Sequence, residues 1–250
     1  MGGGMSYNPY AGIQRIALEL SNRCVNAREH ARCPAHFKID DAPANLPTRH
    51  VAHVFETMKA HVPNFKGFVY FHLYNEPLAD PRLMSFVAMA KKALPHALIQ
   101  ITTSGWNLDQ TLLDELAAAG ARAVRVSIYD KPTLNRVSHL REPKGLKLIH
   151  DGKAPMDWRG TLRMDIPAVY DAKPTSQGKR CRAPLRQLCI GHDGRVILCC
   201  QDWARTVTFG SLDQLSLDAI LHQDSVAIAY ANLLRGNRLY DICKRCYHDD

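Results

Sequence analysis

The sequence predicts an α/β protein in which a parallel sheet is followed by a small cysteine-rich unit. Two observations support this prediction. Between residues 13 and 150, apolar runs typical of strands alternate with segments whose apolar residues recur three and four positions apart, as on an amphipathic helix. After residue 170, a hairpin pattern and six of the eight cysteines come together. Successive strand–helix units imply parallel strands with right-handed crossovers, in either a barrel or a doubly wound sheet.

The first part of the chain supplies the alternating strands and helices. Asn75-Glu76-Pro77 ends the second strand. Asp80 and Pro81 predict the start of the next helix, because Asp caps helices well and Pro fits their first position. Gly120 predicts the end of the third helix. In chain order, the expected elements are a strand at 13–20, a helix at 48–62, a strand at 65–74, a helix at 81–94, a strand at 97–105, a helix at 108–120 and a strand at 122–130.

After residue 130 the patterns weaken. Residues 146–151 and 160–169 predict a fifth and a sixth strand, and 152–180 predicts a linker or an irregular end of a barrel. Residues 185–200 then predict a β-hairpin whose turn, at Asp193-Gly194, supplies a positive φ. A helical segment is expected at 212–236.

Composition limits the class of protein. Of the 250 residues, 46% are hydrophobic and 22% are charged, a globular balance that argues against disorder, collagen and coiled coil. No apolar run approaches the roughly 20 residues of a membrane span. The start lacks the order of a signal peptide, so we expect a cytoplasmic protein with a flexible leader at 1–12. The net charge of +8 is scattered along the chain, which argues against nucleic acid as a partner.

The C-terminal cysteines have spacings typical of a metal centre. Cys243 and Cys246 form a C-x2-C knuckle, and Cys199 ends the predicted hairpin, which Cys181 precedes. Four such thiolates can enclose a cubane iron–sulfur cluster or a tetrahedral zinc ion. Structural zinc usually takes two knuckles, and only one is present, which favours iron–sulfur. Unligated buried thiols are a third interpretation.

A second group of possible ligands follows the first predicted strand directly. Cys24 and Cys33 flank a loop in which His30 completes a C-x5-H-x2-C array. In a parallel α/β barrel this loop lies at the carboxyl ends of the strands, where sites are built. His30 is interpreted either as a third ligand or as a loop histidine beside the site.

Taken in order, the motifs resemble those of radical S-adenosylmethionine (radical SAM) enzymes with a C-terminal auxiliary iron–sulfur domain of the SPASM or twitch kind. In such enzymes a first strand leads into a cysteine loop, as LELSNRC leads to Cys24 here, and the loop often ends in Cys-Pro, as at Cys33. Their second strand ends in a Gly-Glu-Pro-like turn, which NEP at 75–77 resembles, and their third strand ends in a turn similar to TTSG. The auxiliary signature, Cys, Gly-x4-Cys and C-x2-C, matches Cys181, Gly194, Cys199, Cys243 and Cys246.

The resemblance implies a partial (β/α)6 TIM-type barrel over 13–170 and an auxiliary domain of a β-hairpin plus helix over 171–250. It also implies two 4Fe-4S clusters and S-adenosyl-L-methionine as cofactors. An enzyme of this kind cleaves S-adenosylmethionine to methionine and a 5′-deoxyadenosyl radical, which takes a hydrogen atom from the substrate. The implied site residues are Cys24, His30 and Cys33 for the first cluster, Cys181, Cys199, Cys243 and Cys246 for the auxiliary cluster, and Asn75, Glu76, Pro77, Ser104 and Ser127 for the cofactor pocket.

The first cysteine loop departs from the family pattern, because its middle cysteine is missing and the loop is longer than usual. Imidazole at that position would raise the cluster potential, as it does in Rieske centres. Either His30 is the third ligand, or a thiol such as Cys189 or Cys200 replaces it, or the chain is a degenerate scaffold that binds a partner. Cys200 neighbours a ligand on a strand and is expected to face away from it.

The resemblance leaves the substrate open between a sugar or cyclitol and a peptide, and it leaves the outcome open between dehydrogenation and epimerisation. Cys189 and Cys200 are candidate hydrogen donors to a substrate radical, or else small buried hydrophobic residues. An external electron donor such as flavodoxin or ferredoxin is expected. The chain resembles the short, single-auxiliary-cluster form of the family, one member of which oxidises a cyclitol alcohol. No N-terminal peptide-recognition domain is expected, which favours a small molecule over a peptide.

Overall fold

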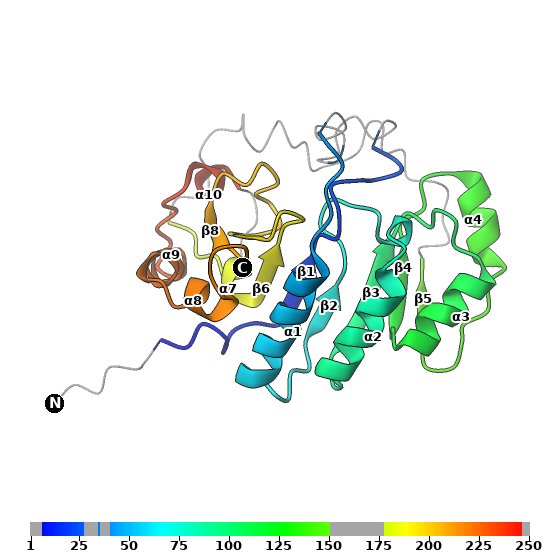
Figure 1. Ribbon diagram of the computed structural model, residues 1–250. Coiled ribbons are helices and arrows are strands. Elements are labelled where there is room, and N and C mark those ends of the chain that lie inside the picture. Colours follow the sequence, from blue (N-terminus) through cyan, green and yellow to red (C-terminus); the bar gives the residue numbers. More distant parts are fainter. Residues whose placement is uncertain (1–6, 28–34, 36–40, 151–177, 247–250) are drawn as a thin grey trace.

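The computed structural model describes residues 7–27, 35, 41–150 and 178–246. It confirms the α/β prediction: eight strands form a single sheet in the order β5-β4-β3-β2-β1-β6-β7-β8 (Figure 1). Neighbouring strands from β5 across to β6 are parallel, whereas β6, β7 and β8 pair antiparallel. The strands are β1 (Arg15–Leu18), β2 (Phe68–Tyr70), β3 (Leu98–Thr103), β4 (Ala123–Val126), β5 (Lys147–Ile149), β6 (Gln187–Ile190), β7 (Arg195–Ile197) and β8 (Thr208–Ser211).

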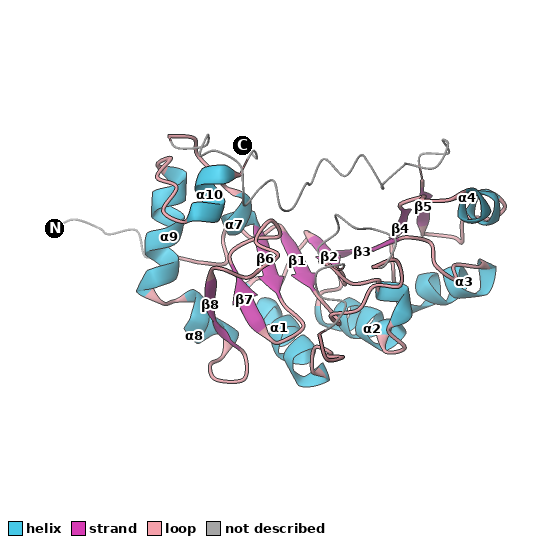
Figure 2. Cartoon of the chain, turned by 90° about the horizontal axis from the view of Figure 1, so that it is seen from above, coloured by secondary structure: helices cyan, strands magenta, loops and turns pink. Residues whose placement is uncertain are grey.

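The helices α1, α2 and α3 cover one face of the parallel part of this sheet (Figure 2). Figure 2 shows α1, α2 and α3 side by side along the row of strands, with α7 to α10 grouped near β6 and β8. The helices are α1 (Thr48–His61), the 3-10 helix η2 (Pro77–Ala79), α2 (Leu83–Ala93), α3 (Gln110–Ala119), α4 (Lys131–Ser138), α7 (Ala183–Arg186), α8 (Leu217–Leu221), α9 (Asp224–Leu234) and α10 (Asp241–Arg245).

Strand alternation divides the apolar side chains between the two faces. Ile16 and Leu18 of β1 are fully buried in the main core, to which Phe55 of α1 also belongs. Ala17 lies between them in the sequence and joins a separate small cluster with Cys189 and Ile197. Because successive side chains of a strand point to opposite faces, this small cluster marks the face away from the helices.

The hairpin predicted at 185–200 is present as β6 and β7, and it continues the main sheet. β6 pairs with β1 in parallel, Ala17 opposite Cys189, so the cysteine-rich part of the chain is joined to the barrel-like part through backbone hydrogen bonds. Gly194 has a φ of +73°, which confirms the positive φ expected at this turn. The helical segment expected at 212–236 is divided into α8 and α9.

Three local predictions need correction. The helix expected at Pro81 begins at Leu83, and Asp80 does not cap it: its carboxylate accepts from Arg82 N at 2.9 Å and forms an ion pair with the Arg82 guanidinium at 2.7 Å. The second strand is shorter than the apolar run 65–74 indicated. α4 was not predicted, although Asp130 caps it by accepting from Thr133 N at 2.6 Å. The sixth strand expected at 160–169 lies outside the described residues.

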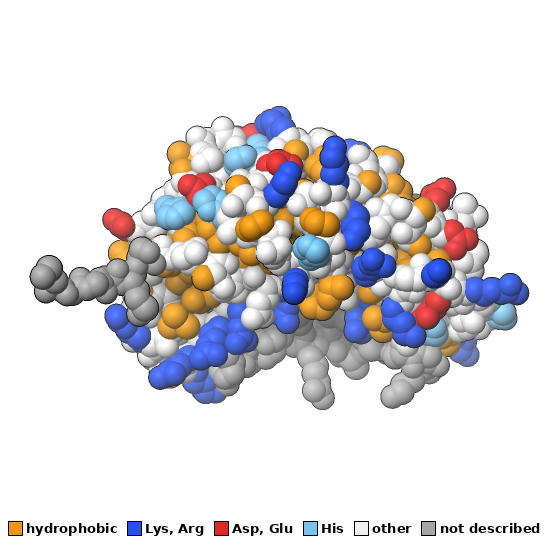
Figure 3. Space-filling view, turned by 90° about the horizontal axis from the view of Figure 1, so that it is seen from below, with side chains coloured by type: hydrophobic (Ala, Val, Ile, Leu, Met, Phe, Trp, Pro, Cys, Tyr) orange, Lys and Arg blue, Asp and Glu red, His pale blue; other side chains and the backbone are white. Residues whose placement is uncertain are grey.

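The distribution of basic side chains and the length of the helices are relevant to whether the protein binds nucleic acid or a membrane. On the face shown in Figure 3, Lys and Arg side chains gather at the lower left and are interspersed elsewhere with apolar, neutral and His side chains. Within the described residues, none of the helices combines the length and the apolar character that a membrane crossing requires.

Candidate functional site

A pocket of about 150 Å³ lies where β1, β2, β3 and β4 end. Because these strands are parallel, the segments that follow them meet at one edge of the sheet. Five of the residues expected to bind the first cluster or the cofactor line this one pocket, namely Cys24, Asn75, Glu76, Ser104 and Ser127. Its other walls are formed by Asn26, His72, Leu73, Tyr74, Thr102, Thr103 and Tyr129.

Glu76 connects the end of β2 to the end of β3. One carboxylate oxygen accepts from Thr103 Oγ1 at 2.6 Å and from Leu78 N at 3.1 Å. The other accepts from Ser104 N at 2.8 Å and Ser104 Oγ at 2.7 Å. A carboxylate offers about four acceptor positions, so these bonds occupy its capacity. The geometry thus gives Glu76 the role of fixing Ser104, and direct contact between Glu76 and a ligand ammonium remains a prediction.

The Asn75-Glu76-Pro77 turn is also tied to the cysteine loop. Glu76 N donates to the carbonyl oxygen of Arg23, the residue before Cys24, at 3.1 Å. The Asn75 side chain accepts from Leu73 N at 3.2 Å and donates to Phe71 O at 3.2 Å, which closes the turn. Pro77 begins η2 and is buried. Cys24 is therefore held beside the pocket by backbone contacts, whereas His30 and Cys33 lie outside the described residues.

His72 lines the same pocket and was missed by the sequence analysis. Its Nδ1 is buried and has no hydrogen-bond partner among the described residues, and its ring meets the Tyr70 ring edge-on at 5.4 Å. Burial lowers the pKa of His72 to about 4, so the imidazole is neutral near pH 7. The sequence did contain a signal for it: His72 lies two residues after Tyr70, the last residue of β2, so both side chains are expected on the same face of the sheet.

A second cavity, of about 210 Å³, brings together the four cysteines expected to hold an auxiliary cluster. Cys181, Cys199, Cys243 and Cys246 all line it, although they come from a loop, the end of the hairpin and α10. Liquid water occupies about 30 Å³ per molecule, so the cavity can hold a group of several atoms. In the described part of the chain, no three His, Cys, Asp or Glu side chains surround a single-ion position.

At least two thiols of this second cavity lie in surroundings that disfavour the charged thiolate when no metal is bound. Burial is the main reason why the pKa values of the thiols are high: that of Cys243 is raised to about 12 and that of Cys199 is also raised. The Arg238 guanidinium acts in the opposite direction on Cys243. Arg238 is itself buried and donates to Lys179 O at 2.8 Å and Arg180 O at 3.0 Å. A metal must displace the thiol protons, and the fixed positive charge favours the thiolate form.

Two of the remaining cysteines differ in position. Cys200 was expected to face away from the ligand site, but it lines the same cavity as Cys199. Cys199 nevertheless belongs to the main core, whereas Cys200 packs against the cluster of Ala17, Cys189 and Ile197, so the expected difference in direction is kept. Cys189 is fully buried with Ala17 and Ile197, and it lines neither the cofactor pocket nor the cysteine-lined cavity. That environment matches the packing interpretation of Cys189.

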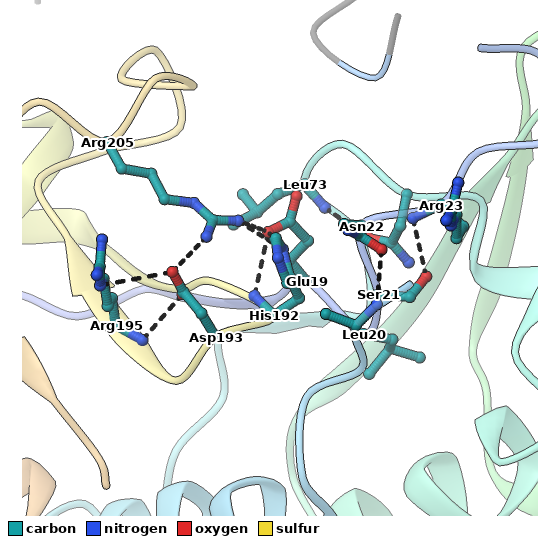
Figure 4. Close-up of polar contacts among 12 residues, drawn as sticks. Glu19, Leu20, Ser21, Asn22, Arg23, Leu73, His192, Asp193, Arg195 and Arg205 are labelled. Atoms are coloured by element: carbon teal, nitrogen blue, oxygen red, sulfur yellow. Dashed lines mark hydrogen bonds and ion pairs between the residues drawn. The ribbon is translucent and has the colours of Figure 1, made fainter. Parts of the chain in front are cut away.

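A buried ionic group joins the two halves of the sheet (Figure 4). Glu19 follows β1, and its carboxylate contacts His192 Nδ1 at 2.8 Å and accepts from His192 N at 3.1 Å. The Arg205 guanidinium also bonds to Glu19 and reaches Asp193 at 2.5 Å. These residues come from the end of β1, the hairpin turn and the loop after β7, so they fix the hairpin against the pocket edge.

Comparison with known proteins finds similarity to an iron–sulfur domain and to an S-adenosylmethionine-dependent enzyme. Residues 181–247 match the SPASM iron–sulfur cluster-binding domain. The S-adenosyl-L-methionine-dependent 2-deoxy-scyllo-inosamine dehydrogenase of Niallia circulans is 25% identical over 190 residues, which cover 73% of this chain and 74% of the relative.

Two solved structures share the fold over nearly the whole chain. BtrN in complex with AdoMet and 2-DOIA has a TM-score of 0.76 at 21% identity, covering 94% of this chain and 93% of that one. SeMet BtrN in an open conformation has a TM-score of 0.70 at 20% identity, covering 98% and 94%. The predicted resemblance and the partial-barrel fold class are confirmed. The SPASM match also spans the four cysteines expected to bind the auxiliary cluster, Cys181, Cys199, Cys243 and Cys246.

Proposed function

Because this chain carries a SPASM iron–sulfur domain on the fold of an S-adenosylmethionine-dependent dehydrogenase, we propose that it is a radical SAM oxidoreductase. In this proposal one cluster is held by Cys24, His30 and Cys33, and an auxiliary cluster is held by Cys181, Cys199, Cys243 and Cys246. The observation that supports it most strongly is the meeting of Cys24, Asn75, Glu76, Ser104 and Ser127 at one pocket, as the family resemblance required.

S-adenosylmethionine bound at the first cluster would supply a 5′-deoxyadenosyl radical, and the auxiliary cluster would accept the second electron of an oxidation. The chain's own residues prepare the pocket for this chemistry. Glu76 holds the Ser104 hydroxyl and amide in place, so these polar groups need little reorganisation when a ligand binds. His72 stays neutral and presents an imidazole without a positive charge. Buried aromatic walls such as Tyr74 limit the access of water.

The substrate we propose is a small polyhydroxylated ring alcohol, oxidised to a carbonyl. The support is the relative from Niallia circulans, whose name identifies it as a dehydrogenase of 2-deoxy-scyllo-inosamine. A peptide substrate is the second candidate. Flavodoxin or ferredoxin would supply the first electron, and the cytoplasm would keep the eight thiols reduced.

Iron analysis tests the two-cluster assignment. After anaerobic reconstitution, we expect about eight irons per chain, four for each cubane. Cys243→Ala and Cys24→Ala should each remove about four of these irons. Cys189→Ala is the matched control, because it deletes a buried thiol outside both cavities, and it should keep the full iron content. One zinc per chain and no iron would instead favour the scaffold interpretation.

A further inference from the structure

Tyr74 connects the two cavities. It lines the first pocket, and its side chain is almost entirely buried there. Its hydroxyl donates a hydrogen bond to the carbonyl oxygen of Cys200. Cys200 follows Cys199 directly, and both residues line the second cavity. A single side chain therefore extends from the wall of one site to the backbone that carries a proposed ligand of the other.

The hydroxyl remains a donor under ordinary conditions. Burial raises the pKa of Tyr74 well above its usual range, and the thiols of Cys200 and Cys199 act in the same direction. A protonated phenol in a nearly dry environment forms a stronger hydrogen bond than it would in water. The contact joins residues 126 positions apart in the sequence, so it is a tertiary feature and not a local turn.

We propose that Tyr74 is a positioning residue that couples the cofactor pocket to the auxiliary cluster, holding the Cys199–Cys200 backbone in place and raising the reduction potential of that cluster. The inference rests on the proposed function, because it requires a cluster in the second cavity. The role assigned to Tyr74 is to link the two cofactor sites, in addition to forming a wall of the first pocket.

Such a coupling has a use in the proposed oxidation. When the alcohol carbon has lost its hydrogen atom, one electron must still leave for the auxiliary cluster, and the hydroxyl proton leaves to solvent, giving the carbonyl product. The Tyr74 ring, its hydroxyl, the Cys200 carbonyl and the backbone to Cys199 form a continuous path of covalent and hydrogen bonds between the two cavities.

The sign of the effect on the potential follows from the peptide dipole. A carbonyl oxygen is the negative end of that dipole, and the Tyr74 hydroxyl compensates it. Without the donor, the negative end of the Cys200 carbonyl would be uncompensated one residue from Cys199, the proposed ligand of a cluster that must accept another electron. Hydrogen bonding and local charge are among the factors that set iron–sulfur potentials. Loss of the hydroxyl should therefore make the auxiliary cluster harder to reduce.

Redox titration of the reconstituted holoenzyme, followed by electron paramagnetic resonance, tests the inference without any substrate. Tyr74→Phe should shift the midpoint potential of the auxiliary cluster to a more negative value and leave that of the first cluster unchanged. Tyr70→Phe is the control, because Tyr70 packs against the same Ala17, Cys189 and Ile197 cluster as Cys200, and among the described residues it is the Tyr74 hydroxyl, not that of Tyr70, that bonds to the Cys200 carbonyl. This control should leave both potentials unchanged.

A second substitution separates tuning from simple damage to the fold. Incorporation of 3-fluorotyrosine at position 74 keeps the ring and makes the hydroxyl a stronger donor, so the auxiliary potential should shift in the positive direction. Shifts of opposite sign support the inference. An auxiliary potential that is the same in wild type, Tyr74→Phe and the fluorinated protein overturns it. A wild-type protein that binds only one cluster refutes the proposed function instead, and the iron content shows which has failed.

Discussion

Replacing Glu19 by Gln tests how the hairpin is fixed to the rest of the sheet. The Glu19 side chain is 1% exposed, and its partner Arg205 is 9% exposed, so both charges lie away from water. The substitution keeps the shape of the side chain and one carbonyl that can accept from His192 N, but it removes the negative charge that faces the guanidinium. The expected consequence is a loss of folding stability.

The size of this loss follows from the remaining contacts. Removing one partner of a buried ion pair costs about 3–5 kcal/mol, because the other charge is left without compensation. Here Arg205 keeps its contact with Asp193 at 2.5 Å, so we expect the lower end, about 3 kcal/mol. For a chain of this size, 1 kcal/mol corresponds to about 2–4 °C in Tm, which gives a decrease of roughly 6–12 °C.

Anaerobic thermal and urea unfolding of the reconstituted protein, followed by circular dichroism, measure this change. Glu142→Gln is the matched control, because it breaks an exposed pair with Lys147 that water screens, and it should change the stability far less. Adding Arg205→Met to Glu19→Gln should cost less than the sum of the two single changes, since the lone charge is then removed. A Glu19→Gln protein as stable as the Glu142→Gln control would refute the assigned role of the junction.

Three further outcomes are expected. Burial holds the pKa of His72 at about 4 against the ordinary 6.5, so between these pH values the unfolded chain takes up a proton that the folded chain does not. The free energy of unfolding should therefore fall by at most about 3 kcal/mol as the pH drops through this window. His72→Phe should lack this decrease when its unfolding at pH 7 and at pH 4.5 is compared with that of the wild type. Glu76→Gln should weaken S-adenosylmethionine binding about tenfold with unchanged iron content, because it loses one of the bonds that position Ser104; equal affinities by calorimetry would contradict this. Cys200→Ser should keep about eight irons if Cys199 is the ligand, whereas loss of about four would identify Cys200 as the ligand.

The cofactor pocket could be predicted because each of its motifs can be recognised from neighbouring residues in the sequence. Each of the motifs ends a strand, and the carboxyl ends of parallel strands meet at one edge, so Cys24, Glu76 and Ser104 could be placed together without coordinates. The positive φ of Gly194 could be predicted in the same way, since a tight hairpin turn needs a residue with a positive φ. The cysteine spacings likewise indicated which thiols share the second cavity.

Other features depend on contacts that a linear pattern does not contain. The Glu19–Arg205 pair joins residues 186 positions apart, and the bond from Tyr74 to Cys200 spans 126. Asp80 fits an N-cap in sequence, but in the fold Arg82 also donates to the carbonyl oxygens of Leu46 and Leu20, which fixes its guanidinium on Asp80. The signal for α4, an Asp followed by Pro two residues later, was present in the sequence and was overlooked.

Reductive cleavage of S-adenosylmethionine tests the central claim most directly. The reconstituted protein, incubated anaerobically with dithionite and S-adenosylmethionine, should release 5′-deoxyadenosine and methionine in equal amounts. Cys24→Ala should abolish this release, and Cys243→Ala, which lacks only the auxiliary cluster, should retain it. A protein that holds about eight irons, binds S-adenosylmethionine and still forms no 5′-deoxyadenosine would contradict the assignment as a radical SAM enzyme.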